Sequence, residues 1–471
     1  MNMTTLSPAA SAMQSAIDLW DTWARLAGLW WSRHTGAPPG AGSDERLQAL
    51  VGFARQASPL YRRLYAHLPR ERIELRELPV VDKAMLMRNF NAWSTDRRVR
   101  KAEVLRFLAD RTRIGEAYLG RYRVWKTSGT SGTPGIFLQD AQAISVYEAL
   151  VLTQLESAFD AASAQRFFAG AGRSALVAAT GDHFASVTSW MHMSRTHPIA
   201  EARVFSVLEP APRLVAQLND FQPTFLASYP SVLALLAEEQ RCGRLAIAPS
   251  LVWSGGEFLG GRAQGAIEEA FGCRVMNEYG ASECLSIAFG CREGWLHVNS
   301  EWVMLEGVDA NRRPVAPGEL SHTTLLTNLA NRVQPVIRYD LGDRIVVSPG
   351  ACACGNPLPA IRVEGRRDAT LEVRGVRLPP LALSTVVEEA AGEHRFQIAQ
   401  AAGDRLRVRF ESEGGPAERA RIGHLACRAL ERYLASQSVQ GVRVELGAEP
   451  PRVDPRSGKL HAVTCEMASG A

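Results

Sequence analysis

Five short apolar runs, each separated from the next by a helical pattern, constrain the fold of this chain more than any other feature. They are SALVAAT (174–180), ARVFSVL (202–208), PTFLASY (223–229), PSLVWSG (249–255) and CRVMNEYG (273–280). Strands that alternate with helices usually pair in parallel, because the helix supplies the crossover that a parallel connection needs. The pattern predicts an α/β domain whose ligands gather at the carboxyl ends of the strands.

The length of 471 residues indicates two or three domains. After the charged run GRRDAT, which begins at Gly365, the chain carries two strand-like segments, RLRVRF (405–410) and VRVEL (442–446), with a helical pattern between them. We therefore predict a helical extension over 1–43, a large α/β domain over 44–367, and a small α+β domain over 368–471 that moves as a lid. The hinge is placed at Asp368.

The extension is predicted to contain an amphipathic helix with an aromatic face. Its apolar residues recur at helical spacing and include Ile17, Trp20, Trp23, Ala24, Ala27, Trp30 and Trp31. Such a face either packs on the body of the protein or meets a membrane surface. Asp18, Asp21 and the small number of basic residues favour packing on the body, so no stable membrane anchoring is expected.

Composition and charge limit the classes of binding partner and the cellular location that we expect for this chain. Lysine and arginine number 53 against 49 acidic residues, a net charge of +4, which gives no reason to expect a nucleic acid partner. Eight cysteines in so long a chain are too few for a disulfide framework. No signal peptide pattern and no run of about 18 apolar residues is present, so a cytoplasmic location is expected.

The stretch TSGTSGTPG (127–135) is the clearest motif in the chain. It combines five hydroxyl side chains with three glycines. Glycine lets the backbone approach an anion closely, while backbone N–H groups and hydroxyls donate to its oxygens. The loop lacks the GxxxxGK[ST] spacing of a Walker loop. A polyphosphate is the expected ligand, and an ordinary surface loop is the alternative if the motif is taken alone.

Further motifs along the chain argue against an ordinary surface loop. They are SGGE (254–257), NEYGASE (277–283), PVIRYDLGD (335–343), GRRD (365–368) with Gly375, and Gly458 with Lys459. Together with the loop, and in this order, they resemble the adenylate-forming superfamily of acyl- and aryl-CoA ligases, luciferases and peptide-synthetase adenylation domains. EYGASEC and VIRYDLGDR are most similar to the phenylacetate-CoA ligase branch. The resemblance implies a large N-terminal domain and a small mobile C-terminal domain.

The resemblance also assigns roles to residues. Glu283 would bind Mg²⁺, and Lys459 would contact the α-phosphate and the substrate carboxylate during adenylation. Asp343 would bind the ribose hydroxyls, Arg366 the ribose and phosphate region, and Tyr279 the adenine. The full set expected to bind ATP is Thr127, Ser128, Gly129, Thr130, Ser131, Gly132, Gly255, Gly256, Glu257, Glu278, Tyr279, Gly280, Asp343 and Arg366. One departure is Thr133, which stands where the family commonly has a lysine, so Mg²⁺ and hydroxyl donors must neutralise more of the phosphate charge.

Cysteine and histidine spacing gives a second site. Cys291 and His297 are separated by five residues, and Cys352-x-Cys354 follows further along the chain. Three thiolates and one imidazole complete a tetrahedral shell for structural zinc and leave no open position for catalysis. Buried, unligated cysteines are the alternative, and the phenylacetate-CoA ligase-like branch bears a similar set. Cys284 is the substitute ligand.

The expected activity is ATP-dependent conversion of a carboxylic acid to an acyl-adenylate, followed by transfer to the thiol of coenzyme A with release of AMP. The resemblance favours an aryl or arylacetic acid, with Tyr147, Phe184 and Tyr229 in the regions of the pocket walls and His183 near the carboxylate. The alternatives are transfer to an acyl carrier protein or an amine, and a nucleotide-binding protein without turnover.

Overall fold

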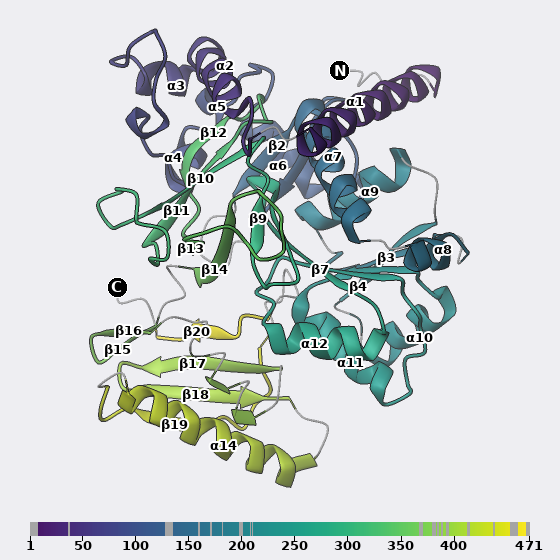
Figure 1. Ribbon diagram of the computed structural model, residues 1–471, viewed down its shortest axis with the longest axis vertical. Coiled ribbons are helices and arrows are strands. Elements are labelled where there is room, and N and C mark those ends of the chain that lie inside the picture. The colour runs from purple at the N-terminus through teal and green to yellow at the C-terminus, as the bar shows by residue number, and fades with distance from the viewer. Residues whose placement is uncertain are drawn as a thin grey trace.

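The computed structural model describes most of the chain (Figure 1). The described residues are 8–35, 38–127, 135–158, 161–169, 172–180, 182–196, 201–207, 209, 211–366, 371–378, 383, 386–387, 390–391, 395–411, 415–436, 439–452 and 460–467. Of the predicted site residues, Ser128, Gly129, Thr130, Ser131, Gly132, the hinge Asp368 and Lys459 lie outside this part, as does the side chain of Arg366.

A nine-stranded sheet forms the centre of the large domain, in the order β13-β14-β9-β8-β7-β6-β5-β3-β4. Its parallel half consists of β3 (Ser174–Ala178), β4 (Ala202–Ser206), β5 (Phe225–Ser228), β6 (Leu251–Gly255) and β7 (Val275–Ala281). These are the five predicted runs, so the α/β prediction is confirmed. The other half is antiparallel and consists of β8 (Cys284–Gly290), β9 (Leu296–Val298), β13 (Asp343–Val347) and β14 (Ala360–Arg366).

Helices provide the crossovers and cover the sheet. They are α7 (Ala141–Ala158), α8 (Ala161–Ala169), α9 (Ala185–Thr196), α10 (Ala211–Phe221), α11 (Pro230–Arg241) and α12 (Gly261–Phe271). The crossover helices bury an apolar face against the parallel strands; Leu214 and Leu218 of α10, one turn apart, belong to the same core cluster as Leu226 of β5.

The N-terminal part adds smaller elements around a second core. They are α2 (Ser43–Ala57), α3 (Pro59–Leu64), α4 (Lys83–Arg88), α5 (Phe90–Trp93), α6 (Lys101–Ala109), the 3₁₀ turns Leu75–Glu77 and Arg111–Arg113, and the hairpin β1 (Arg123–Lys126) and β2 (Ile136–Gln139). A three-stranded sheet of β10 (Val303–Val308), β11 (Thr323–Asn328) and β12 (Val336–Asp340) packs into the same core.

The C-terminal part has a hydrophobic core of its own. The hairpin β15 (Leu371–Val373) and β16 (Val376–Leu378) precedes a four-stranded sheet ordered β19-β18-β17-β20, with strands Arg443–Leu446, Arg405–Phe410, Phe396–Ala402 and Val463–Cys465. Helix α14 (Gly415–Ser436) covers this sheet, at the bottom of Figure 1. The two strand-like segments and the helix between them are therefore confirmed. The chain leaves the large sheet at Arg366 and enters β15 at Leu371, on either side of the predicted boundary.

Helix α1 (Pro8–His34) lies across α7 at the edge of the large domain (Figure 1). Polar side chains join it to the body: Thr22 donates to Glu148 (2.9 Å), Arg25 to Ser145 (2.8 Å), and Arg33 forms an ion pair with Glu301 (3.0 Å). The predicted packing on the body is thus confirmed, although the four tryptophans of the helix keep 43% to 74% of their surface exposed. Among the described helices, none is long and apolar enough to cross a membrane.

Candidate active site

The motif blocks converge on one large cavity at the carboxyl ends of the parallel strands. The cavity has a volume of about 1960 Å³. Its wall includes Thr127 from the end of β1, Gly255, Gly256 and Glu257 from the end of β6, residues 277–283 of β7 and the turn after it, and Asp343 of β13. Segments more than 200 residues apart in sequence therefore share one site, as an α/β sheet with ligands at its strand ends requires.

The Glu283 carboxylate is buried at the cavity wall. The Tyr339 hydroxyl donates to its Oε1 at 2.7 Å, and the Asn328 side chain donates to its backbone carbonyl at 3.0 Å. These contacts fix the carboxylate in one orientation. A hard oxygen donor held in this way suits Mg²⁺.

Tyr279 and Asp343, which were predicted to contact the adenine and the ribose, lie side by side. The Tyr279 hydroxyl donates to Asp343 Oδ2 at 2.6 Å, and both residues line the cavity. Asp343 begins β13, where it pairs in register with Arg366 of β14. The backbone thus brings three predicted nucleotide-binding residues to one corner of the site.

Gly280 is required where the chain folds back from β7 into β8. A Cβ atom at this position would lie 1.9 Å from the backbone carbonyl oxygen of Leu285, a contact that no side chain can make. The close approach of the two backbones presents Glu278 and Glu283 to the cavity from one short segment. The glycine of the NEYGASE block is therefore a packing requirement as well as a motif residue.

Two hydrogen bonds join Thr127 to Gly135, the residues at the two ends of the hydroxyl-rich loop. The Thr127 N–H donates to the Gly135 carbonyl (2.9 Å), and the Gly135 N–H donates to the Thr127 hydroxyl (2.8 Å). Two residues earlier, on β1, the Trp125 indole donates to the Ser282 carbonyl at 2.8 Å. The loop therefore leaves the body beside Glu283, although residues 128–134 themselves lie outside the described part.

Glu257 joins the two domains. Its Oε2 accepts from the Ser231 N–H at 3.1 Å, and its Oε1 accepts from the Leu460 N–H of the C-terminal segment at 3.0 Å. Leu460 directly follows Lys459 in sequence. A residue that the resemblance assigned to ATP binding thus makes a contact between the large domain and the small one.

Glu278 lies in the wall of the cavity, next to Trp253. Its Oε2 accepts from the Trp253 indole at 3.1 Å, and Ser286 is a second hydrogen-bond partner. Burial raises the pKa of Glu278 to about 7, and the two hydrogen bonds only partly offset this effect. The sequence assigned Glu278 to ATP binding on its motif alone, and gave no signal for either partner.

Three of the four predicted pocket residues, Tyr147, Phe184 and Tyr229, line the cavity. His183 is placed differently. Its ring is buried against Phe107, with 5.5 Å between ring centroids, and its Nε2 meets the Asp110 carbonyl at 3.0 Å. The role near the carboxylate that the sequence suggested for His183 remains a prediction, which this geometry does not favour.

Lys126 is a cavity residue that the sequence reasoning missed. It precedes the hydroxyl-rich loop and forms an ion pair with Asp182, with 2.6 Å between Nζ and Oδ2. A cation beside the loop partly answers the loss of the lysine at position 133. The sequence could have indicated this role. Lys126 directly precedes the hydroxyl-rich stretch, and a lysine in that position supplies the positive charge that the stretch itself lacks.

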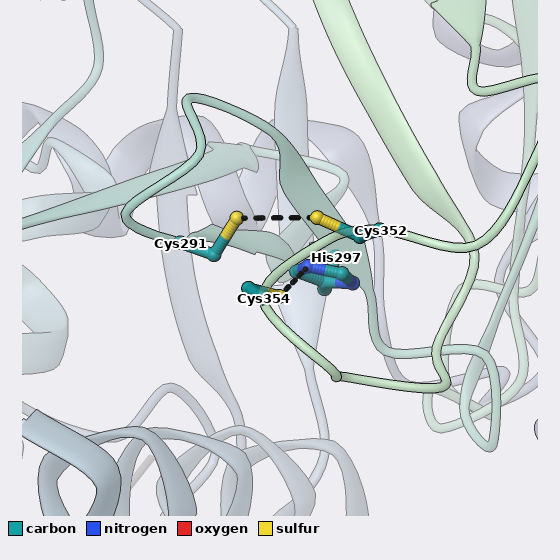
Figure 2. Close-up of side chains that lie close together, drawn as sticks. All are labelled: Cys291, His297, Cys352 and Cys354. Atoms are coloured by element: carbon teal, nitrogen blue, oxygen red, sulfur yellow. Dashed lines mark hydrogen bonds between the residues drawn. The ribbon is translucent and has the colours of Figure 1, made fainter.

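The Cys/His residues form a compact cluster (Figure 2). One ligand atom from each of Cys291, His297, Cys352 and Cys354 lies within 4.8 Å of all the others. The Cys291 and Cys352 sulfurs are 3.7 Å apart. Two sulfurs bound tetrahedrally to one Zn²⁺ at ~2.3 Å stand roughly 3.8 Å apart, so the spacing fits this ion.

The imidazole is oriented for metal binding. His297 Nδ1 lies 2.9 Å from the Leu358 carbonyl, to which it can only donate, so Nε2 carries the lone pair. That atom faces the Cys354 sulfur at 3.1 Å, and burial lowers the pKa of His297, which favours the neutral ring. The substitute ligand, Cys284, lies elsewhere: it is buried near Tyr147, and burial raises its pKa to about 12.

Sequence comparisons agree with the resemblance to phenylacetate-CoA ligases that the motifs indicate. No family model matches the chain. The phenylacetate-coenzyme A ligase of Thermus thermophilus is 25% identical over 362 residues, which cover 73% of this chain and 74% of that protein. Protein CapK of Staphylococcus aureus is 26% identical over 133 residues, 28% of each chain.

Structural comparisons establish the fold. The crystal structure of 2-hydroxyisobutyryl-CoA ligase in the postadenylation state, in complex with R3-HIB-AMP, matches with a TM-score of 0.64 at 21% identity, covering 91% of this chain and 90% of that one. The same ligase with 2-HIB-AMP and CoA in the thioesterification state matches with a TM-score of 0.51 at 23% identity and the same coverage.

Proposed function

We propose that this chain is a member of the adenylate-forming superfamily and that it uses ATP to activate a carboxylic acid as an acyl-adenylate and then transfers the acyl group to the thiol of coenzyme A. The observation that carries the proposal is the convergence of Thr127, Glu283 and Asp343 on one cavity. Its motifs and its phenylacetate-CoA ligase relative support the assignment to an AMP-forming acid-thiol ligase.

In the first half-reaction, a carboxylate oxygen of the acid attacks the α-phosphorus of ATP, and pyrophosphate leaves. Because an anion attacks an anion, positioning and charge neutralisation carry most of the catalysis. We infer that Tyr279 and Asp343 hold the nucleoside and that Glu283 holds Mg²⁺, which supplies positive charge to the phosphates. Lys126 and the loop 127–135 would receive the outer phosphates.

In the second half-reaction, the thiol sulfur attacks the acyl carbon and loses its proton. The single bond between the acyl carbon and the phosphate oxygen breaks, and AMP leaves. Lys459 would stabilise the adenylation step from the small domain, which must then withdraw to admit the thiol. The Glu257–Leu460 hydrogen bond supports a closed arrangement with the C-terminal segment at the site. The fall in TM-score from 0.64 to 0.51 between two states of one neighbour, at equal coverage of this chain, is consistent with rotation about Asp368.

An aryl or arylacetic acid is the proposed substrate class. Tyr147, Phe184 and Tyr229 contribute aromatic surface to the cavity, together with Trp190 and Trp253. The Cys291, His297, Cys352 and Cys354 cluster is proposed to hold structural Zn²⁺, since all four ligands come from the protein and no position is left for a substrate.

The test is a panel of aryl, arylacetic and aliphatic acids, assayed for pyrophosphate release with and without CoA. We expect an aryl acid to release pyrophosphate and, when CoA is added, to yield a thioester and AMP. The Glu283→Gln variant is the control for ATP-dependent turnover. Pyrophosphate release without thioester would redirect the second step to a carrier protein or an amine. No pyrophosphate release with any acid would refute adenylation.

A further inference from the structure

Glu278 is an ionisable group in the cavity wall that the proposed chemistry does not use. It is half-buried on β7, where its hydrogen-bond partners are Trp253 and Ser286. The proposed mechanism gives the nucleoside instead to Tyr279, the next residue of the strand. Successive side chains of a strand point to opposite faces, so Glu278 is directed away from Tyr279. The surroundings of Glu278 therefore indicate which other ligand group would meet it.

Strand register places Glu278 on the same face of the sheet as two aromatic rings. Glu278 is paired with Gly255 of β6, which stands two residues after Trp253. Trp253 is in turn paired with Ala227 of β5, which stands two residues after Phe225. Because every second side chain of a strand lies on the same face, Phe225, Trp253 and Glu278 share one face of the sheet.

The rings form a continuous wall that ends at Glu278. The Phe225 and Trp253 ring centroids are 6.1 Å apart, and Trp190 of α9 stacks on Phe225 at 6.0 Å with 25° between the ring planes. The Trp253 indole donates to Glu278 Oε2 at 3.1 Å. All four residues line the cavity, and we call them the acid pocket. A flat aryl group packs well on such a wall, because aromatic rings favour stacked and edge-to-face contacts.

The protein supplies only hydrogen-bond donors to Glu278. The Trp253 indole nitrogen cannot accept a hydrogen bond. The Ser286 hydroxyl oxygen accepts from the side-chain amides of Gln154, at 3.4 Å, and Asn299, at 3.2 Å. Its own hydrogen is therefore left to donate to Glu278. A carboxylate that meets donors on the protein side is set to accept from a ligand as well.

The electrostatics of the acid pocket leave room for a further donor. Among the residues that the structure describes, no lysine or arginine forms an ion pair with Glu278. An ionised carboxylate has about four acceptor sites, and the indole and the hydroxyl fill only part of them. Burial raises the pKa of Glu278 to about 7, so these donors do not fully offset the loss of hydration. A donor on the ligand would reduce that cost.

We propose that Glu278 determines the specificity of the acid pocket and selects an aryl acid that carries a hydrogen-bond donor, a hydroxyl or an amino group, on its ring. This inference rests on the proposed function, since it takes the cavity to hold an acid. The substrate ring packs on Trp190, Phe225 and Trp253, and the ring substituent donates to the Glu278 carboxylate. A methyl group in the same place leaves the carboxylate without this partner, a loss that discriminates more strongly than a change in apolar contact.

A matched panel of acids tests the preference in the wild-type protein. Benzoic and phenylacetic acids with an amino, a hydroxyl or a methyl group at the meta or para position are similar in size and differ in the donor. We expect kcat/KM for pyrophosphate release to be at least about tenfold higher for the best amino or hydroxy acid than for its methyl analogue. The comparison of amino with hydroxy acids identifies the donor.

The Glu278→Gln variant tests the residue. Glutamine keeps an oxygen for the Trp253 indole, but its NH₂ group cannot accept from a ligand, so the preference should fall by at least about tenfold. Glu268→Gln is the matched control and should keep the wild-type preference. Glu268 of α12 is also a half-buried acidic residue of the cavity wall, and glutamine keeps the oxygen that accepts from the Val275 N–H at 3.0 Å.

Binding of the same acids without ATP, measured by isothermal titration calorimetry, separates this proposal from the proposed function. A protein that binds the amino or hydroxy acid at least about tenfold more tightly than the methyl acid, but releases no pyrophosphate, would refute adenylation and support the acid pocket. Pyrophosphate release with equal kcat/KM for donor and methyl acids would support adenylation and overturn the acid pocket. A donor preference that survives Glu278→Gln would overturn the role of Glu278.

Discussion

Replacing Glu278 by glutamine should change how the stability of the protein depends on pH. Glu278 is half-buried beside Trp253, and the pKa of its carboxyl is raised from 4.5 to about 7 because loss of hydration disfavours the charged form. Glutamine has the same shape and no charge. It keeps an acceptor for the Trp253 indole, which donates to Glu278 Oε2 at 3.1 Å.

The direction and size of this pH dependence follow from the coupling between proton binding at Glu278 and folding. Between pH 4.5 and pH 7 the folded protein binds a proton at Glu278 that the unfolded chain has released, so the free energy of unfolding falls as pH rises. A difference of about 2.5 pKa units corresponds to about 3 kcal/mol. Wild type and Glu278→Gln should thus diverge by about 3 kcal/mol between pH 4.5 and pH 7.5, with the variant relatively more stable at the higher pH.

Urea unfolding of the large domain, followed at several pH values in this range, measures the effect. Parallel curves for wild type and Glu278→Gln would mean that Glu278 is already ionised at pH 5 in the folded protein. The burial argument for this group would then be wrong.

Three further predictions concern the proposed chemistry. Lys459→Ala should greatly slow adenylate formation yet spare thioester formation from a supplied acyl-adenylate; equal loss in both half-reactions, measured separately, would contradict domain alternation. Glu283→Gln should lower the adenylation rate by roughly 10²–10³ and raise the Mg²⁺ concentration needed for half-maximal rate; an unchanged Mg²⁺ dependence would exclude it as the metal ligand. The purified protein should hold one equivalent of zinc by elemental analysis, and Cys354→Ser should lose it and melt at a lower temperature; well under one equivalent in protein with reduced cysteines would remove the zinc assignment.

The sequence predicted the parallel half of the sheet well because its strands are short apolar runs, fully buried in β5 and almost fully buried in β3. Such runs, separated by helical patterns, leave few alternatives to a parallel arrangement. The motif residues were found for a related reason: Gly280 and Asp343 stand at strand ends and tight turns, where residue types are restricted. The Cys/His cluster was predicted from spacing and resemblance, and the structure brings all four residues together.

Other features depend on long-range packing and could not be predicted. The spacing of the tryptophans in α1 indicates an apolar face, but the packed face contains Thr22, Leu29 and Arg33. Thr22 and Arg33 bond to Glu148 and Glu301, which lie more than 100 residues away in sequence. The partners of Glu278 and the position of His183 are likewise set by neighbouring strands and loops. The spacing of residues in the sequence shows that a helix has an apolar face. It does not show which face of the helix packs against the rest of the protein.

The Cys/His cluster has a mechanical consequence. It connects the turn after β8 to the loop between β13 and β14, and so fastens the last two strands of the large sheet at the end opposite Asp343 and Arg366. β14 is also the strand from which the chain departs toward the C-terminal part. If the C-terminal part rotates as proposed, a metal bound by the cluster would hold β13 and β14 together, and the movement would then not distort the proposed nucleotide site at Asp343.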